Sequence, residues 1–111
     1  MISLNVYLTP KPGRIQELER AIKDVWLAAM ETQPGFIRAA LNRPFSDTDL
    51  AALEASRPSY DVEGVSYWTS EKERLEWAAR DIHQEVWPQV VEETESHIEV
   101  VKPALCLSIS G

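Results

Sequence analysis

Few side chains in this sequence have a type and position suited to chemistry, and a histidine in its second half stands out first. His83 is one of two histidines. An imidazole with an ordinary pKa near 6.5 can take a proton from a phenol or deliver one to an oxygen intermediate. The alternative is a surface histidine at a break in a helix. The second histidine, His97, is expected to be structural or exposed.

Thiol and metal chemistry have little support. The single cysteine, Cys106, excludes an internal disulfide and a cysteine-based zinc site. It lies between two leucines without a neighbouring base, which indicates a small packed side chain and not a nucleophile. Two histidines far apart in the chain do not suggest a metal site, although a set of histidine and carboxylates assembled by folding stays open. We expect no cofactor.

Asn5 and Tyr7 are candidates for holding an oxygen atom of a ligand. Residues 2–9 alternate between aliphatic and polar side chains, which indicates a strand. Asn5 and Tyr7 therefore share the polar face of this strand. If that face meets the helices, both side chains are buried and need hydrogen-bond partners. A ligand could supply these partners, but so could the backbone or water, and the face could also meet solvent.

Four tryptophans offer flat surfaces for an aromatic ligand. Trp68, at the end of a predicted strand, could stack on a substrate or pack in the core. Trp26 and Trp87 lie on apolar helical stripes and are predicted to be core or pocket wall. Trp77 is off the stripe of its helix, so we expect it at a contact between subunits. Arg38 could pair with an anionic substrate, or it could be a solvated residue at the rim.

Length and charge exclude several classes of protein. The chain has 111 residues, a size typical of a single domain, here 1–111. Its net charge of −7 disfavours nucleic acid and anionic membranes as partners. No apolar run approaches the roughly 20 residues of a membrane span, and the first residues do not resemble a secretion signal. With one cysteine, the sequence predicts a cytoplasmic protein.

The pattern of side chains predicts six main elements and a long insert. Apolar spacing predicts a helix from about residue 15 to Pro34-Gly35, and a second helical region opens with Ser70 and Glu73 in a capping-box arrangement. We expect this second region to carry Leu75, Ala78, Ala79, Ile82 and Val86 inward and to kink or break between about 81 and 88, ahead of Pro88. The predicted strands cover residues 2–9, 36–41, 61–69 and 97–110.

Two segments depart from regular patterns. The insert, residues 42–59, is long for a connection between strands. It is predicted to contain one or two helical turns within 46–55, capped by Ser46 or Asp47, with Leu50 and Leu53 facing inward. It could cover a site as a flap or be a solvated loop. In the last strand the apolar phase shifts near Pro103, which indicates a bulge or bend.

The order of the elements predicts an α+β protein with a ferredoxin-like βαββαβ fold and a four-stranded antiparallel sheet. Two helices would cover one face of the sheet, so the other face needs cover. The aliphatic side chains of the first and last strands form more apolar surface than a monomer usually exposes. They are Ile2, Leu4, Val6, Leu8, Leu105, Leu107 and Ile109. We therefore expect a homodimer that packs aliphatic face on aliphatic face.

Three short motifs resemble the antibiotic biosynthesis monooxygenase domain of the dimeric α+β barrel superfamily. They are Pro34-Gly35-Phe36 after the first helix, Tyr67-Trp68-Thr69-Ser70 at the end of the third strand, and Glu71-Lys72-Glu73 opening the next helix. The resemblance covers nearly the whole chain except the 42–59 insert. It implies a dimer whose two sheets form a barrel, with a pocket in each subunit between sheet and helices.

The resemblance also implies an activity, namely cofactor-independent oxygenation of a small aromatic or quinol-type compound by molecular oxygen. In such a site the deprotonated substrate itself reduces oxygen, and the protein excludes water and stabilises the anion. On this basis Asn5 and His83 are the expected catalytic residues. The expected substrate-binding residues are Tyr7, Trp68, Trp26 and Arg38.

Two departures from the family pattern leave alternatives open. Quinol-oxidising members can carry an Asn four residues before the strand Trp, where this chain has Gly64. A haem-degrading branch uses an Asn, a Trp and a His; Asn5 and Trp68 match, but the region expected to hold the His reads Trp77-Ala78-Ala79. The alternatives are therefore a non-catalytic module that binds a small ligand or acts in stress, and a haem-binding, haem-degrading monooxygenase.

Overall fold

The computed structural model describes residues 1–104. The strands are β1 (Ile2–Pro10), β2 (Phe36–Asn42), β3 (Val62–Trp68) and β4 (Thr94–Pro103). The helical elements are α1 (Ile15–Arg20), η1 (Ala21–Leu27), α2 (Ala28–Met30), α3 (Asp47–Leu53), α4 (Glu71–Ala79) and α5 (Asp81–Glu92).

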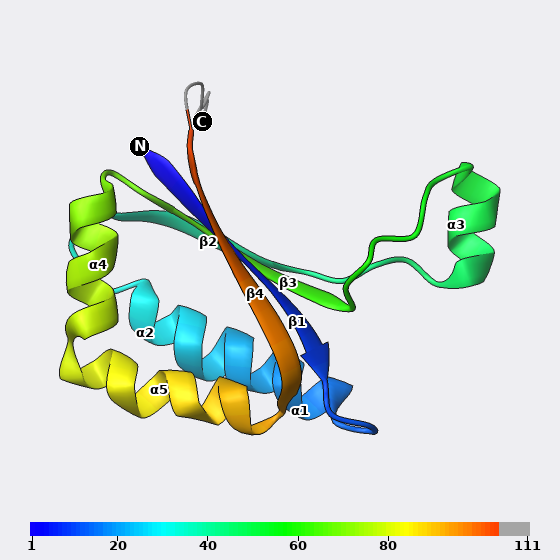
Figure 1. The fold of residues 1–111 in the computed structure, drawn as a ribbon, viewed down its shortest axis with the longest axis horizontal. Coiled ribbons are helices and arrows are strands. Elements are labelled where there is room, and N and C mark those ends of the chain that lie inside the picture. Colours follow the sequence, from blue (N-terminus) through cyan, green and yellow to red (C-terminus); the bar gives the residue numbers. More distant parts are fainter. Residues whose placement is uncertain (105–111) are drawn as a thin grey trace.

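One antiparallel sheet with the strand order β2-β3-β1-β4 forms the centre of the protein. All helices except α3 lie on one side of this sheet (Figure 1). The predicted α+β, ferredoxin-like fold class is confirmed, and α3 is added between β2 and β3. No helix in the described residues is long and apolar enough to cross a bilayer.

The aliphatic side of β1 faces the helices. Leu4, Val6 and Leu8 are at most 5% exposed and belong to one core cluster with the helical residues Leu18 and Ile22. The prediction that the aliphatic residues form the subunit contact is therefore wrong for these three. The apolar stripe of the first helical region needs an apolar surface opposite it, and only this side of β1 provides one. Leu105, Leu107 and Ile109, which were predicted to belong to the same apolar surface, lie outside the described residues.

The first helical region, α1 to α2, is one rod with a π-helical middle, η1. Its buried side chains include Leu18, Ile22 and Met30, which continues the predicted stripe. The chain then turns at Gly35, whose φ of 84° is a left-handed conformation that favours glycine. A side chain there would also collide with the Cβ and carboxylate of Glu73 in α4. This glycine lets the start of β2 lie directly against the start of α4.

The second helical region is broken at Arg80, whose φ and ψ of −73° and 152° are extended. The break lies one residue before the predicted interval of 81 to 88, and Pro88 lies inside α5. Trp77, in α4 ahead of the break, is buried in the core against Trp68, so its predicted place at a subunit contact is wrong. Leu75 and Ile82, predicted to face inward, are 53% and 37% exposed.

The helix caps agree in part with those predicted from the sequence. Ser70 Oγ accepts a hydrogen bond from the Glu73 amide, but the Glu73 carboxylate accepts one from Thr69 Oγ1, outside the predicted box. Ser46 caps α3, in which Leu50 is buried as predicted but Leu53 is 57% exposed.

The predicted bulge near Pro103 is absent from the described residues. The β1–β4 register is continuous from Ile2↔Pro103 to Thr9↔Ser96 and shifts only at Pro10, opposite Thr94. Pro103 is therefore accommodated without disturbing the pairing of the strands.

Two glycines with similar backbone angles give a matched test of the contact at Gly35. Gly13 has a φ of 75° and open space where a Cβ would stand, whereas a Cβ at Gly35 would meet Glu73. Gly13→Ala should lower the free energy of unfolding by about 1 kcal/mol through backbone strain alone. Gly35→Ala adds the collision and should cost about 3 kcal/mol. Urea unfolding measures both; equal losses would show that the contact with α4 is unimportant.

Candidate functional site

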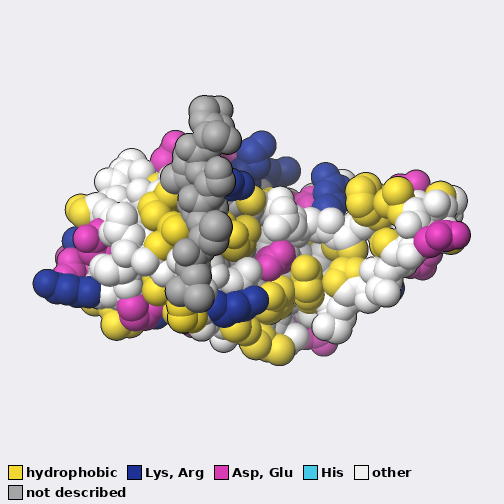
Figure 2. Space-filling model, turned by 90° about the horizontal axis from the view of Figure 1, so that it is seen from above, with side chains coloured by type: hydrophobic (Ala, Val, Ile, Leu, Met, Phe, Trp, Pro, Cys, Tyr) yellow, Lys and Arg dark blue, Asp and Glu magenta, His cyan; other side chains and the backbone are white. Residues whose placement is uncertain are grey.

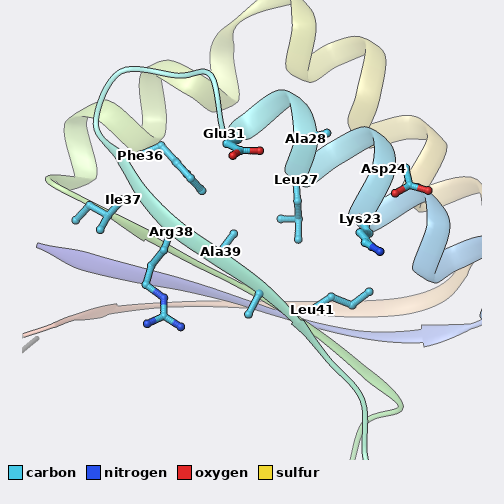
Figure 3. Close-up of a pocket in the computed structure, with 11 residues that line it drawn as sticks. Lys23, Asp24, Leu27, Ala28, Glu31, Phe36, Ile37, Arg38, Ala39 and Leu41 are labelled. Atoms are coloured by element: carbon cyan, nitrogen blue, oxygen red, sulfur yellow. The ribbon is translucent and has the colours of Figure 1, made fainter. Parts of the chain in front are cut away.

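The sheet divides the predicted site residues into two groups. Trp68 and Trp26 lie in the core on the helix side, and His83 on α5 is linked to them through Trp77 and Trp87. Asn5 and Tyr7 alternate with the core residues of β1 and therefore point to the other side. Arg38 also points away from the helices (Figure 3). The structure thus places three of the six predicted residues on each side of the sheet and does not form one site from all of them.

A continuous cluster of rings fills the helix side, which we call the aromatic cluster. From the β2 end its centroids are separated by 5.7 Å (Phe36–Trp68), 6.4 Å (Trp68–Trp77), 5.0 Å (Trp77–His83) and 6.1 Å (His83–Trp87). Trp87 contacts two further rings, Trp26 at 5.0 Å and His97 at 5.3 Å. The cluster therefore runs from the fully buried Trp68 to the exposed His97 on the edge strand β4.

The inner part of the cluster is closely packed. Trp68 is 0% exposed, and its Nε1 donates a hydrogen bond to Ser66 Oγ at 2.9 Å. Trp26 is 2% exposed, and its ring lies over Gly64, where an added Cβ would be 3.2 Å from Cζ3. The indole of Trp26 therefore fills the space that a longer side chain at position 64 would enter. Neither tryptophan presents a free ring face to a ligand in this conformation.

His83 lies between the rings of Trp77 and Trp87. Its ring is edge-on to Trp77 at 88° and stacked on Trp87 at 15°. Burial lowers the pKa of His83 below its ordinary value; Glu99 opposes this shift and Arg74 adds to it. Its Nδ1 is buried and has no hydrogen-bond partner in the described residues. The imidazole is therefore neutral at pH 7, and such a group can accept a proton.

The other side of the sheet carries a hydrogen-bond network around Glu63. The carboxylate accepts from Asn5 Nδ2 at 2.9 Å, from Asn42 Nδ2 at 3.1 Å and from Tyr60 Oη at 3.4 Å. The ring of Tyr60 packs against that of Tyr7, with centroids 4.5 Å apart and an angle of 45° between the ring planes. Burial and the charge of Glu63 raise the pKa of Tyr60. Asn5 is thus held by Glu63, and by the Ser3 hydroxyl, which donates to its side-chain oxygen at 3.1 Å.

Two hollows are large enough for small molecules. A groove of about 790 Å³ runs between the first helical region and the edge strand β2, with Leu27, Phe36 and Leu41 toward its inside and Lys23 and Asp24 along its border (Figure 3). A smaller hollow of about 400 Å³ is lined mainly by Tyr7, Tyr60 and hydroxyl side chains near the start of β4. No group of three metal-ligating side chains occurs among residues 1–104.

Comparison with solved structures establishes the fold. SnoaB from Streptomyces nogalater, a cofactor-independent oxygenase, superposes with a TM-score of 0.74 at 15% identity, over 98% of this chain and 97% of its own. A Caulobacter crescentus protein assigned provisionally as an antibiotic biosynthesis monooxygenase gives 0.69 at 14% identity, over 94% and 89%. SO0527 from Shewanella oneidensis gives 0.68 at 22% identity, over 91% and 87%. No protein-family model and no curated protein matches the sequence.

These likenesses confirm the predicted resemblance at the level of the fold. At such low identities they do not carry over a substrate or a set of active-site residues. The arrangement of this chain's own side chains therefore has to support any function assigned to it.

Two residues of the arrangement were not candidates in the sequence. Glu63 is the centre of a network whose donors come from residues 5, 42 and 60, so no local pattern marks it. Trp77 was assigned to a subunit contact because the helical stripe was extended through Arg80. The only available signal was the number of aromatic residues between 68 and 97, which is consistent with a shared cluster.

The lowered pKa of His83 makes stability depend on pH. Between the pKa of the folded protein and the unfolded value near 6.5, the unfolded chain binds more protons, so stability falls as the pH is lowered through this window. Above it, the contribution is constant. We expect His83→Phe, which keeps an aromatic ring between Trp77 and Trp87, to reduce this loss. Urea unfolding at pH 7.5 and 5.5 tests it. An identical loss in both proteins would contradict a buried neutral imidazole.

Proposed function

We propose that this protein is a cofactor-independent oxygenase of a small aromatic compound with an ionisable hydroxyl group, such as a phenol or quinol. The observation that carries the proposal is the position of His83, a neutral imidazole between two indoles where the aromatic cluster approaches the edge strand β4. A planar ring that enters at this edge meets a proton acceptor and flat apolar surfaces together.

In the proposed reaction His83 takes the proton of the substrate hydroxyl, and the resulting anion donates electrons to molecular oxygen. One oxygen atom enters the ring carbon, the other leaves as water with the two displaced hydrogens, and the phenol becomes a quinone. This balance needs no external reductant. The indoles exclude water around the anion. Trp87, which is partly exposed, takes the stacking role that the sequence suggested for Trp68, while Trp68 and Trp26 support the cluster from inside.

A specific observation favours a second function, the binding of a small ligand without catalysis. Trp26 fills the space over Gly64, so the core side of β3 offers no polar group at that position. The groove along β2 is open and has an apolar interior with charged residues at its border. Such a groove suits an amphipathic molecule and contains no histidine. Arg38 beside this groove would then pair with an anionic group of the ligand.

The residues of this chain do not fit the haem-degrading alternative. That alternative requires Asn5, Trp68 and a histidine to reach one ligand. Asn5 points to the far side of the sheet and is held by Glu63 at 2.9 Å, whereas Trp68 and His83 are on the helix side.

We also propose that the protein is a homodimer, now through the side of the sheet that the helices leave open. This side carries Tyr7, Tyr67 and Ile98, of which Ile98 is 65% exposed. A second sheet packed against it would cover these side chains and leave the helix side free for a substrate. The expected cytoplasmic location stays a prediction from the single cysteine.

Oxygen uptake with a panel of hydroquinones and polycyclic phenols tests the oxygenase. We expect His83→Ala to reduce the rate about 100-fold or more, because a positioned base typically contributes that much. The rate of the wild type should fall as the pH is lowered through the depressed pKa of His83, since only the neutral imidazole accepts a proton. The matched control is Glu85→Ala, an exposed change on the same helix, which should leave the rate unchanged.

Two outcomes would remove the catalytic proposal. The first is no uptake above that of buffer with any compound of the panel; quenching of tryptophan fluorescence by the same compounds would then favour the binding module. The second is a His83→Ala variant as active as the wild type. A loss in Asn5→Ala as large as that expected for His83→Ala would instead place the substrate on the other side of the sheet.

A further inference from the structure

The segment between β2 and β3 forms an arm that stands away from the rest of the protein. It comprises residues 43–61 and contains α3. Figure 1 shows the arm projecting beyond the end of the β2–β3 hairpin, on the far side from α4. Within the described residues, no other helix or strand packs extensively on α3. The two ends of the arm contact the rest of the subunit through the Arg43–Glu19 ion pair and the packing of Tyr60 on Tyr7, whereas α3 has no extensive surface of its own subunit beneath it.

The conformation of the arm is fixed by local contacts. Ser46 caps α3, Glu54 ends it in a left-handed conformation with φ 54°, and Arg57 Nη1 donates to Asp47 Oδ1 at 2.9 Å. A helix of seven residues is nevertheless too short to be stable in water by such contacts alone. Phe45 and Leu53 are 59% and 57% exposed, and leaving large apolar side chains in water forgoes the free energy that their burial would provide. These features indicate that the arm packs on another molecule.

The charges of the arm are opposite to those at the far end of the open sheet side. Asp49 and Glu54 on the arm make no ion pair within residues 1–104, and acidic side chains gather at its tip (Figure 2). The strand register places Arg38, Tyr67, Ser3 and Lys102 in one row across the sheet. Arg38 and Lys102 are exposed and likewise have no carboxylate partner in the described residues. This basic row lies at one end of the sheet. The arm leaves the sheet at the opposite end, next to the row that contains Asn42 and Glu63.

We propose that the arm docks on a second copy of this chain, with its acidic tip beside Arg38 and Lys102 of the partner subunit. The inference rests on the proposed dimer through the open sheet side. When two sheets pack face to face about a two-fold axis that runs across their strands, the arm end of one lies over the basic row of the other. Two equal contacts then form, and Phe45 and Leu53 gain a surface to pack against.

The charges also exclude the other simple arrangement. If the two-fold axis ran along the strands, the two acidic arms would lie side by side and the two basic rows would meet each other. Like charges in contact cost free energy. In the arrangement with the axis across the strands, each acidic tip instead meets a basic row. The arm thus determines the relative orientation of the subunits as well as adding to their contact.

Sedimentation equilibrium of charge-reversed variants at low and high salt tests the proposal. Asp49→Lys with Glu54→Lys, and separately Arg38→Glu with Lys102→Glu, should each weaken the dimer by about tenfold or more. Combining all four changes should restore the wild-type dissociation constant, because the charges are exchanged and not removed. The control is Glu85→Lys with Glu92→Lys on the exposed side of α5, which should have no effect. Circular dichroism confirms that each variant is folded.

The possible outcomes distinguish the docking of the arm from the two earlier proposals, the homodimer and the oxygenase. A wild-type protein that is monomeric at micromolar concentration would overturn both the dimer and the docking of the arm, but oxygen uptake would still be measured independently. A dimer that none of the charge reversals weakens would overturn the arm contact alone. Weakening by both reversals without restoration in the combined variant would also contradict it, since the two groups would then act on different partners.

Discussion

Burial of the aliphatic side of β1 is the interaction on which the rest of the structure depends. Leu4, Val6 and Leu8 are at most 5% exposed and meet the stripe formed by Leu18 and Ile22. Because side chains alternate along a strand, this contact also fixes the direction of every neighbour. Asn5 and Tyr7 are turned to the open side, and the strands paired with β1 follow the same register. The two sides of the sheet consequently differ in content: one holds the aromatic cluster, and the other holds the polar network around Glu63.

The aromatic cluster combines a closely packed inner part with the imidazole of His83 nearer the surface. Its inner members, Trp68 and Trp77, are fully buried and hold the helices on the sheet. Its outer members, His83 and Trp87, are partly exposed and rest on the inner ones. The rings of Trp77 and Trp87 lie on either side of His83 and restrict its rotation. The same rings withhold water, which keeps the imidazole neutral.

The fold could be read from the sequence because its signals are local. Strict alternation, the Pro34-Gly35 turn and the Ser70 cap are properties of neighbouring residues, and they located the elements within a few positions. What the sequence could not supply was which side of β1 the helices would cover, because alternation defines two sides without assigning either. That choice separated Asn5 from His83. Pro88 indicated a break but not its position at Arg80, Trp77 was misplaced because the apolar stripe was continued across this residue, and Glu63 depends on donors distant in the chain.

The missing side chain at Gly64 couples two distant parts of the chain. Trp26 packs where this glycine leaves room, so a side chain at position 64 would press on the indole, 3.2 Å from its Cζ3. A smaller residue at position 26 would open an empty chamber against β3, bordered by Trp87, and a polar residue at 64 would then project into it. Substituting both residues at once would therefore exchange a packed interior for a hollow one, and the lost contacts of the indole would lower the stability of the fold.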